Sequence, residues 1–232
     1  MPKVDVVLFD LGGTLVDYYK ASEFPDILEH AMNDIQQLLF EKMAVTYEQD
    51  ELWHRVEEES HEYGDFRVRP MEERLVNIFQ LKTLKSPDFI TKLCQMFLKH
   101  VFDKGHVFED TKPVLQELME RGLKMGLVSN TPWGAPAFLW REELEKLGLV
   151  RYFNAIIFCR DVGWRKPASQ VFTRAFEVLR TDPKSCLFVG DDPKWDISGP
   201  RAVGMDAVLL DRSGEKWGSN AIASLRELLV ML

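Results

Sequence analysis

The sequence predicts an α/β protein whose doubly wound parallel sheet is interrupted by an inserted all-helical region. Short apolar runs bounded by turn residues recur along the 232 residues, and they are nearly continuous rather than alternating. Such runs are typical of strands buried on both faces of a parallel sheet. Helical patterns separate the last four runs, and this alternation indicates a doubly wound core. The runs span residues 4–9, 123–128, 155–158, 186–189 and 207–210.

Two helices of this core can be predicted in chain order. The first begins near Asp110 or Thr111 and ends at Gly122, so a capping residue opens it and a glycine closes it. The second lies between the third and fourth strands, where apolar side chains recur at the spacing of one helical face. Those side chains are Val171, Phe172, Ala175, Phe176 and Leu179.

More than a hundred residues separate the first two strands, far more than an ordinary crossover needs. We expect residues 16–105 to form a helical domain with hinges near 17–20 and 102–106, and residues 1–15 and 106–232 to form the core.

Three apolar stripes and a possible helix start support the helical reading of this insert. The string Thr46-Tyr47-Glu48-Gln49 fits a capping box and predicts that a helix begins there. The stripes are Ile27, Ala31, Ile35, Leu38 and Leu39, then Leu75, Ile78 and Phe79, then Phe89, Ile90, Leu93 and Phe97.

The composition restricts the partners and the compartment. A net charge of −8 repels nucleic acid and anionic membranes. No stretch approaches the ~18 continuous apolar residues of a membrane helix, and MPKVDVVLFD lacks the features of a signal peptide. Cys94, Cys159 and Cys186 form no Cys-x-x-Cys pair, so we expect reduced core thiols in a cytoplasmic protein.

Polar residues follow the first two predicted strands. Asp10 comes directly after the first strand, and Gly12 and Gly13 allow a sharp turn that brings backbone amides close to an anion. Ser129 and Asn130 follow the second strand and offer a hydroxyl and amides to a phosphate oxygen. Taken alone, the first segment also fits a simple acidic turn and the second a capped turn.

Two further segments carry charge near the same predicted edge of the sheet. Lys166 stands just ahead of a helix N-terminus, where the helix dipole already favours anions. Asp191, Asp192 and Asp196 follow the fourth strand, and three such acids near Asp10 call for a cation. Oxygen-only ligands suit Mg²⁺. Because the carboxyl ends of parallel strands meet at one crevice, we expect all four segments to converge. A surface lysine and a run of exposed loop acids are the alternatives.

In this order the four segments closely resemble the motifs of the haloacid dehalogenase-like hydrolase superfamily, over essentially the whole chain. VVLFDLGGTLVD resembles its first motif, LVSN its second, GWRKP its third and VGDDPKWDISGPRAVGM its fourth. The helical insert stands where the family's class-one cap stands. The resemblance implies a Rossmann-like core and a cytoplasmic hydrolase.

The resemblance also implies roles. Asp10 corresponds to the nucleophile, and Ser129 and Lys166 to the groups that orient and neutralise the phosphate. Asp191 corresponds to a magnesium ligand beside Asp10, and Asp196 either binds the metal or holds Lys166. Gly12 offers a backbone carbonyl to the metal, and Gly12, Gly13 and Asn130 are further phosphate-binding candidates. The motif leaves the role of Asp192 open.

One position departs from the family pattern. Most phosphatases of the family carry an aspartate two residues after the nucleophile, which protonates the leaving group and later activates water, but this chain has Gly12. General acid–base help is worth typically ~10²–10⁴ in rate. The sequence therefore predicts slow turnover and a preference for good leaving groups. Asp17, Tyr18, Tyr19 and His61 are candidates to replace the missing acid.

We expect a Mg²⁺-dependent phosphatase that acts on a small phosphorylated metabolite, does not bind nucleic acid or membrane, and is a monomer or homodimer. One alternative is a metal-independent 2-haloacid dehalogenase, against which Asp191, Asp192 and Asp196 argue. Another is a catalytically weak member that only binds a phosphorylated ligand, for which Gly12 is the support.

Four residues without a role in the motifs have two interpretations each. Arg67 and Arg69 of the insert either grip an anionic group of the substrate or, as we favour, pair with acids such as Glu72 or Glu73. Trp133 and Trp164 stand beside motif residues, and either line the crevice or pack in the core or at its rim.

Overall fold

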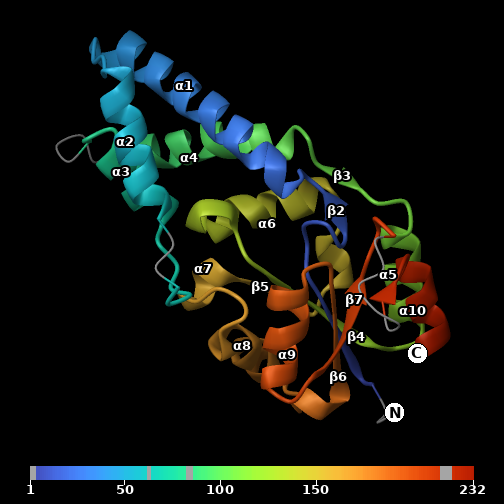
Figure 1. Ribbon diagram of the computed structural model, residues 1–232. Helices are drawn as coiled ribbons and strands as arrows, with labels where there is room; N and C mark the ends of the chain where they lie inside the picture. The colour runs from blue at the N-terminus through green and yellow to red at the C-terminus, as the bar shows by residue number, and fades with distance from the viewer. Residues whose placement is uncertain (1–3, 62–63, 82–85, 215–220) are drawn as a thin grey trace.

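A computed structural model describes residues 4–61, 64–81, 86–214 and 221–232 (Figure 1). Within these ranges the centre of the protein is a six-stranded sheet in the order β5-β4-β1-β6-β7-β8, and all its strand pairs are parallel. The strands are β1 (Val6–Phe9), β4 (Lys124–Ser129), β5 (Ala155–Phe158), β6 (Cys186–Gly190), β7 (Asp206–Leu210) and β8 (Ala221–Ile222).

The strand order places β1 where the direction of winding reverses. From β1 the chain passes to β4 and β5 on one side and then returns to β6, β7 and β8 on the other. Phe9 at the end of β1 lies opposite Leu127 of β4 and Val189 of β6. Because these strands are in register, the segments that follow them open at the same edge, which is where ligands bind in open α/β sheets.

Helices cover both faces of the sheet, as the near-continuous apolar strands predict. Val6 and Leu8 of β1 join a core cluster with Phe172 of α8 (Ser169–Leu179). Val7 and Phe9 belong to a second cluster on the other face, which includes residues of α5 (Thr111–Glu120) and α10 (Leu225–Met231). The predicted doubly wound α/β fold is therefore confirmed.

Shorter elements fill the connections of this core. They are η2 (Pro132–Gly134), α6 (Ala137–Lys146), η3 (Val150–Tyr152), α7 (Cys159–Val162), η4 (Pro183–Ser185), the π-helical η5 (Pro193–Ser198) and α9 (Gly199–Ala202). Cys94, Cys159 and Cys186 are all buried free thiols.

Residues 16–105, which we call the helical insert, rise from one end of the sheet (Figure 1). The short strands β2 (Val16–Asp17) and β3 (His106–Val107) pair antiparallel at its base. The predicted apolar stripes face inward, with Ile27, Ala31 and Ile35 buried and Leu38 at the margin. The helices are η1 (Ala21–Glu23), α1 (Phe24–Met43), α2 (Gln49–Ser60), α3 (Met71–Ile78) and α4 (Pro87–Phe102).

The predicted capping box at residues 46–49 is wrong. The helix α2 begins at Gln49, and the residue before it, Glu48, makes no side-chain cap hydrogen bond. A contact of Tyr47 accounts for the later start of the helix. The Tyr47 hydroxyl donates to the backbone oxygen of Phe79 at 2.6 Å and so ties the segment before α2 to the end of α3.

No helix in the described part of the chain combines the length and apolar character needed to cross a membrane.

Candidate active site

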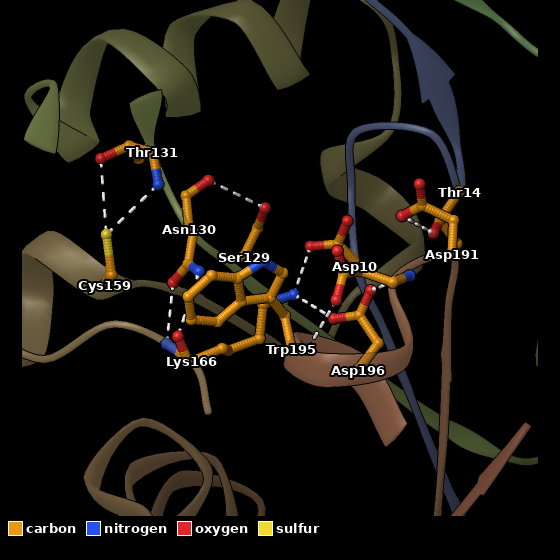
Figure 2. A network of polar contacts seen from close by, with 11 residues as sticks. Asp10, Thr14, Ser129, Asn130, Thr131, Cys159, Lys166, Asp191, Trp195 and Asp196 are labelled. Carbon is orange, nitrogen blue, oxygen red and sulfur yellow. Dashed lines mark hydrogen bonds and ion pairs between the residues drawn. The ribbon is translucent and has the colours of Figure 1, made fainter. Parts of the chain in front are cut away.

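Four loops at the carboxyl edge of the sheet bring polar residues together (Figure 2). Asp10 directly follows β1, Ser129 is the last residue of β4, and Asp191 directly follows β6. Lys166 comes from the loop between α7 and α8, and Asp196 lies within η5. The convergence predicted from the sequence therefore takes place.

The ammonium group of Lys166 joins two of the loops. Its Nζ donates to Oδ1 of Asp10 at 2.5 Å and to Oδ1 of Asp196 at 2.6 Å (Figure 2). Lys166 is only 2% exposed and Asp196 1%. Burial alone lowers the pKa of Lys166, but the two carboxylates outweigh it and raise this pKa above its usual value. Lys166 therefore stays charged and fixes both carboxylates.

Three carboxylates meet around this lysine. Oxygens of Asp10, Asp191 and Asp196 all lie within 4.8 Å of one another. Desolvation and the negative charges of Asp10 and Asp196 raise the pKa of Asp191. Desolvation also raises the pKa of Asp196; Lys166 partly offsets this, and the charge of Asp10 adds to the rise. With all three carboxyls ionised, one ammonium leaves a negative excess of two charges, and the raised pKa values express the cost of holding that excess without a cation. The donor set, all oxygen and doubly negative, fits a hard divalent cation such as Mg²⁺.

Asp192 has a structural role that the motif leaves open. Its carboxylate accepts hydrogen bonds from the backbone N–H groups of Lys194 at 2.7 Å and Trp195 at 2.8 Å, and so caps η5. The N–H of Asp192 donates to Oδ2 of Asp196 at 3.0 Å. Asp192 thus shapes the turn that presents Asp196.

Gly12 and Gly13 serve the turn in different ways. Gly13 has a φ of +75°, and a Cβ built there lies 2.3 Å from Oδ2 of Asp191. Its N–H donates to the backbone oxygen of Val16 at 2.9 Å. The turn uses the Gly13 amide, and the missing side chain makes room for Asp191; phosphate binding by the amides around Gly12 and Gly13 stays a prediction. At Gly12 a Cβ meets Tyr18 at 3.8 Å, an ordinary contact.

Ser129 and Asn130 also differ in role. The Ser129 hydroxyl is nearly buried and donates to the backbone oxygen of Asn130 at 3.2 Å. The Asn130 side chain accepts the backbone N–H of Lys166 at 2.9 Å through Oδ1. This side-chain oxygen joins the β4 loop to the backbone of Lys166, and phosphate binding by Asn130 stays a prediction. Only a contact between segments 36 residues apart reveals this role.

The insert residues proposed as replacement acids occupy varied surroundings. The Tyr18 ring packs edge-on against Trp140 at 5.3 Å, and its buried hydroxyl has no hydrogen-bond partner. Asp17 lies 3.7 Å from His106 at the base of the insert. Tyr19 is half-buried, and desolvation raises its pKa to about 12. A tyrosine so perturbed can donate a proton but cannot act as a base near neutral pH.

The two insert arginines have partners other than those expected. Arg69 pairs with Asp65 at 3.1 Å, and the guanidinium of Arg67 lies 4.3 Å from the centre of the Trp164 ring. Glu72 pairs with Arg160 of α7 at 2.8 Å. The favoured pairing with a nearby acid is therefore confirmed for Arg69, although its partner is Asp65 rather than Glu72 or Glu73, while Arg67 lies over Trp164.

The comparisons with known proteins agree with this site. A family model described as haloacid dehalogenase-like hydrolase matches residues 4–204. The chain is 26% identical over 209 residues to a glyceraldehyde 3-phosphate phosphatase of Methanopyrus kandleri, a match that covers 90% of this chain and 84% of that protein.

Two further relatives match over shorter regions. A phosphoserine phosphatase of Thermus thermophilus is 30% identical over 149 residues, covering 64% of this chain and 56% of that protein. A ribulose-1,5-bisphosphate 5-phosphatase of Halopiger xanaduensis is 35% identical over 106 residues, covering 46% of this chain and 43% of that protein. The matches therefore span about half the length of these two relatives.

Solved structures share the fold across almost the whole chain. A HAD phosphatase from Thermococcus onnurineus superimposes with a TM-score of 0.66 at 24% identity, covering 99% of this chain and 97% of that one. A 2-haloacid dehalogenase from Pseudomonas syringae gives a TM-score of 0.68 at 21% identity, covering 98% and 97%. Since the family model spans most of the sequence, the chain belongs to the haloacid dehalogenase-like hydrolases.

Proposed function

We propose that the protein is a Mg²⁺-dependent phosphatase that hydrolyses a small phosphorylated metabolite through an aspartyl-phosphate on Asp10. One arrangement carries the proposal: a buried lysine bonded to Asp10 and Asp196, with Asp191 completing a group of carboxylates whose oxygens lie within 4.8 Å. Relatives named as phosphatases of sugar phosphates and of phosphoserine support a phosphate monoester as the substrate class.

In this proposal Asp10, Asp191 and Asp196 hold the Mg²⁺, together with the backbone carbonyl of Gly12. The fit rests on the negative excess of these carboxylates and on their clustering at the edge of the sheet. When bound, Mg²⁺ supplies charge neutralisation at the phosphoryl oxygens.

The remaining chemistry belongs to residues of this chain. An oxygen of Asp10 attacks phosphorus in line, the bond from phosphorus to the ester oxygen breaks, and the leaving group departs with its electron pair. Lys166 orients Asp10 through Oδ1, and its positive charge offsets the negative charge that builds up in the transition state. The Ser129 hydroxyl rotates to donate to a phosphoryl oxygen. Water then attacks the aspartyl-phosphate, releases phosphate and regenerates the carboxylate.

In this proposal the absence of a side chain at Gly12 affects how the leaving group is protonated. With no side chain there to protonate the departing oxygen, the leaving group takes its proton from water, so acidic leaving groups such as phenolates are favoured. In the same proposal the helical insert, residues 16–105, acts as a cap over the site. The buried free cysteines suit a reducing compartment, and we propose that the protein works in the cytoplasm.

The test is the hydrolysis of p-nitrophenyl phosphate with and without Mg²⁺. Asp10→Asn removes the nucleophile and is expected to reduce Mg²⁺-dependent turnover to background. Asp206→Asn, at an exposed aspartate that opens β7, is the matched control and is expected to retain activity. Equal turnover by the wild type and Asp10→Asn would show that the proposed mechanism is wrong.

A further inference from the structure

Three of the loops that build the site carry a tryptophan close to the polar residue they present. Trp133 follows the Ser129 loop, Trp164 precedes Lys166 by two residues, and Trp195 directly precedes Asp196. All three indole rings contact residues of one short part of the insert, residues 66–74. In Figure 1 this part of the chain comes down from α2 to lie beside α7 before it turns back into α3.

The first contact is made with the loop that carries Asp196. The Phe66 ring packs edge-on against Trp195, with ring centres 6.0 Å apart and planes at 88°. The Lys194 ammonium lies 5.5 Å from the centre of the Phe66 ring and 4.5 Å from that of Trp195. Trp195 directly precedes Asp196. A contact that fixes this indole therefore also helps to fix the position of the Asp196 carboxylate, which binds Lys166.

The second contact is made with the loop that carries Lys166, and it includes the backbone. Arg165 donates its N–H to the backbone oxygen of Phe66 at 2.8 Å, and Val68 donates to the backbone oxygen of Gly163 at 3.0 Å. These two bonds form an antiparallel bridge. Arg67 and Trp164 are the paired residues of this bridge, and the Arg67 guanidinium lies over the Trp164 ring. The residue before Lys166 is thus held by the insert.

The third contact is made with the loop that follows Ser129. Trp133 adopts a left-handed backbone conformation with φ 53°, which a bulky residue adopts only when its surroundings impose it. Its ring stacks on Phe97 of α4 at 5.3 Å, and the guanidinium of Arg74 lies 5.5 Å from its centre. This indole is anchored in the insert rather than in the core.

We propose that residues 66–74 form a brace that positions the Ser129, Lys166 and Asp196 loops relative to one another. Lys166 must stay within hydrogen-bond distance of two carboxylates that come from separate strands, and the brace joins the loops across that gap. Phe66 is its central positioning residue, since it contacts both the Lys166 loop and the Asp196 loop. The kinetic part of this inference rests on the proposed phosphatase function; the structural part does not.

The test compares the full-length wild type with Phe66→Ala, Phe66→Tyr and Phe40→Ala. Phe40 is a 52% exposed phenylalanine on α1 and provides the matched control. Hydrogen exchange of backbone amides is measured in peptides covering residues 163–167 and 192–197. Phe66→Ala removes the ring that packs on Trp195 but keeps the backbone oxygen that accepts from Arg165, so we expect faster exchange at residues 192–197. Exchange should stay at the wild-type rate in Phe66→Tyr, which keeps the ring, and in Phe40→Ala, which lies elsewhere.

Kinetics on p-nitrophenyl phosphate provide the second measurement. We expect Phe66→Ala to lower kcat by about 10-fold to 100-fold with little change in KM, because misplaced groups cost rate more than binding. Phe66→Tyr restores kcat. If Phe66→Ala does not fold, Arg67→Gln provides the test instead. This variant keeps the backbone bridge but removes the guanidinium that lies over the Trp164 ring. We expect it to increase hydrogen exchange at residues 163–167 alone, and unchanged exchange there would overturn the brace.

The possible outcomes separate the two proposals. Faster exchange at residues 192–197 in Phe66→Ala supports the brace even if the wild type proves to have no phosphatase activity, in which case only the proposed function fails. Unchanged exchange in Phe66→Ala overturns the brace. A fall in kcat without faster exchange overturns it as well, because Phe66 then acts on the substrate rather than on the loops.

Discussion

At the scale of single residues, Gly12 is the position where the sequence predicts a departure from the family pattern. The space beside it is free enough for a side chain, since a Cβ at this position meets only the Tyr18 ring within 4 Å, at 3.8 Å. The glycine is therefore not required by crowding, in contrast to Gly13. In the proposed mechanism, glycine at this position leaves Asp10 without a proton donor beside it.

Gly12→Asp is accordingly expected to increase turnover of substrates with poor leaving groups. A carboxyl at this position can protonate a departing alkoxide, an effect worth about 10²-fold where it is well placed, whereas p-nitrophenolate needs no such help. The measurement is kcat for an alkyl phosphate and for p-nitrophenyl phosphate in the wild type and the variant. Gly12→Asn, with the same size and no acid, is the control. Equal change on both substrates would contradict the explanation.

Several individual roles could not be obtained from sequence. The positions of Asp10, Ser129, Lys166 and Asp191 follow from strand ends, because parallel strands deliver their next residues to one edge. The role of Asn130 does not, because its partner is the backbone of Lys166, which becomes a neighbour only on folding. The sequence pattern shows which residues follow a strand, but it does not show which residues distant in the sequence become neighbours on folding.

At the scale of elements, helix α6 carries a buried acid with little compensation. Glu143 is 6% exposed, and its nearest cation, the Nζ of exposed Lys146, lies 3.8 Å away. Burial raises the pKa of Glu143, Lys146 partly offsets this, and Asp103 of the insert adds to the rise. Tyr18, whose own pKa Glu143 raises further, is the remaining titratable neighbour. The folded state therefore holds this proton to higher pH than the unfolded chain does.

This linkage predicts a pH-dependent gain from Glu143→Gln. An acid with a raised folded-state pKa is neutral in both states at low pH, and its ionisation penalises the folded state as pH rises through and beyond the usual glutamate range. The variant should match the wild type near pH 4 and be more stable at pH 8. Urea denaturation at both values measures this, with exposed Glu142→Gln as control. A constant difference at both pH values would contradict the assignment.

Of the two predicted helix starts, the one near Asp110 or Thr111 is confirmed by α5, while the one at residues 46–49 is wrong. The apolar runs of β1, β4 and β6 report burial on two faces and lie close to the observed bounds. The string at residues 46–49 has the right residues for a capping box, yet α2 begins later because Tyr47 is drawn to Phe79 by its hydroxyl. A tertiary hydrogen bond from outside the helix overrides a local cap preference.

At the scale of the whole molecule, the parallel sheet concentrates negative charge at one edge, because the segments after β1 and β6 open there. The carboxylates of Asp10, Asp191 and Asp196 repel one another in the folded state, and Lys166 compensates only part of this. A divalent cation that binds only the folded chain removes that repulsion. Binding linkage then gives about 2.7 kcal/mol at a free concentration one hundred times Kd.

We therefore expect Mg²⁺ to raise the Tm, and EDTA to reverse the shift. Gly13→Ala tests whether Mg²⁺ binds at these carboxylates. The added Cβ would lie 2.3 Å from Oδ2 of Asp191 and so displace that carboxylate. Gly204→Ala has a similar positive φ, +84°, but meets nothing within 4 Å, so it reproduces the backbone strain without the collision. Both variants should lose some basal stability, while only Gly13→Ala loses the Mg²⁺ shift. A full shift retained in Gly13→Ala would place the cation elsewhere, because strain alone, matched in the control, leaves the carboxylates together.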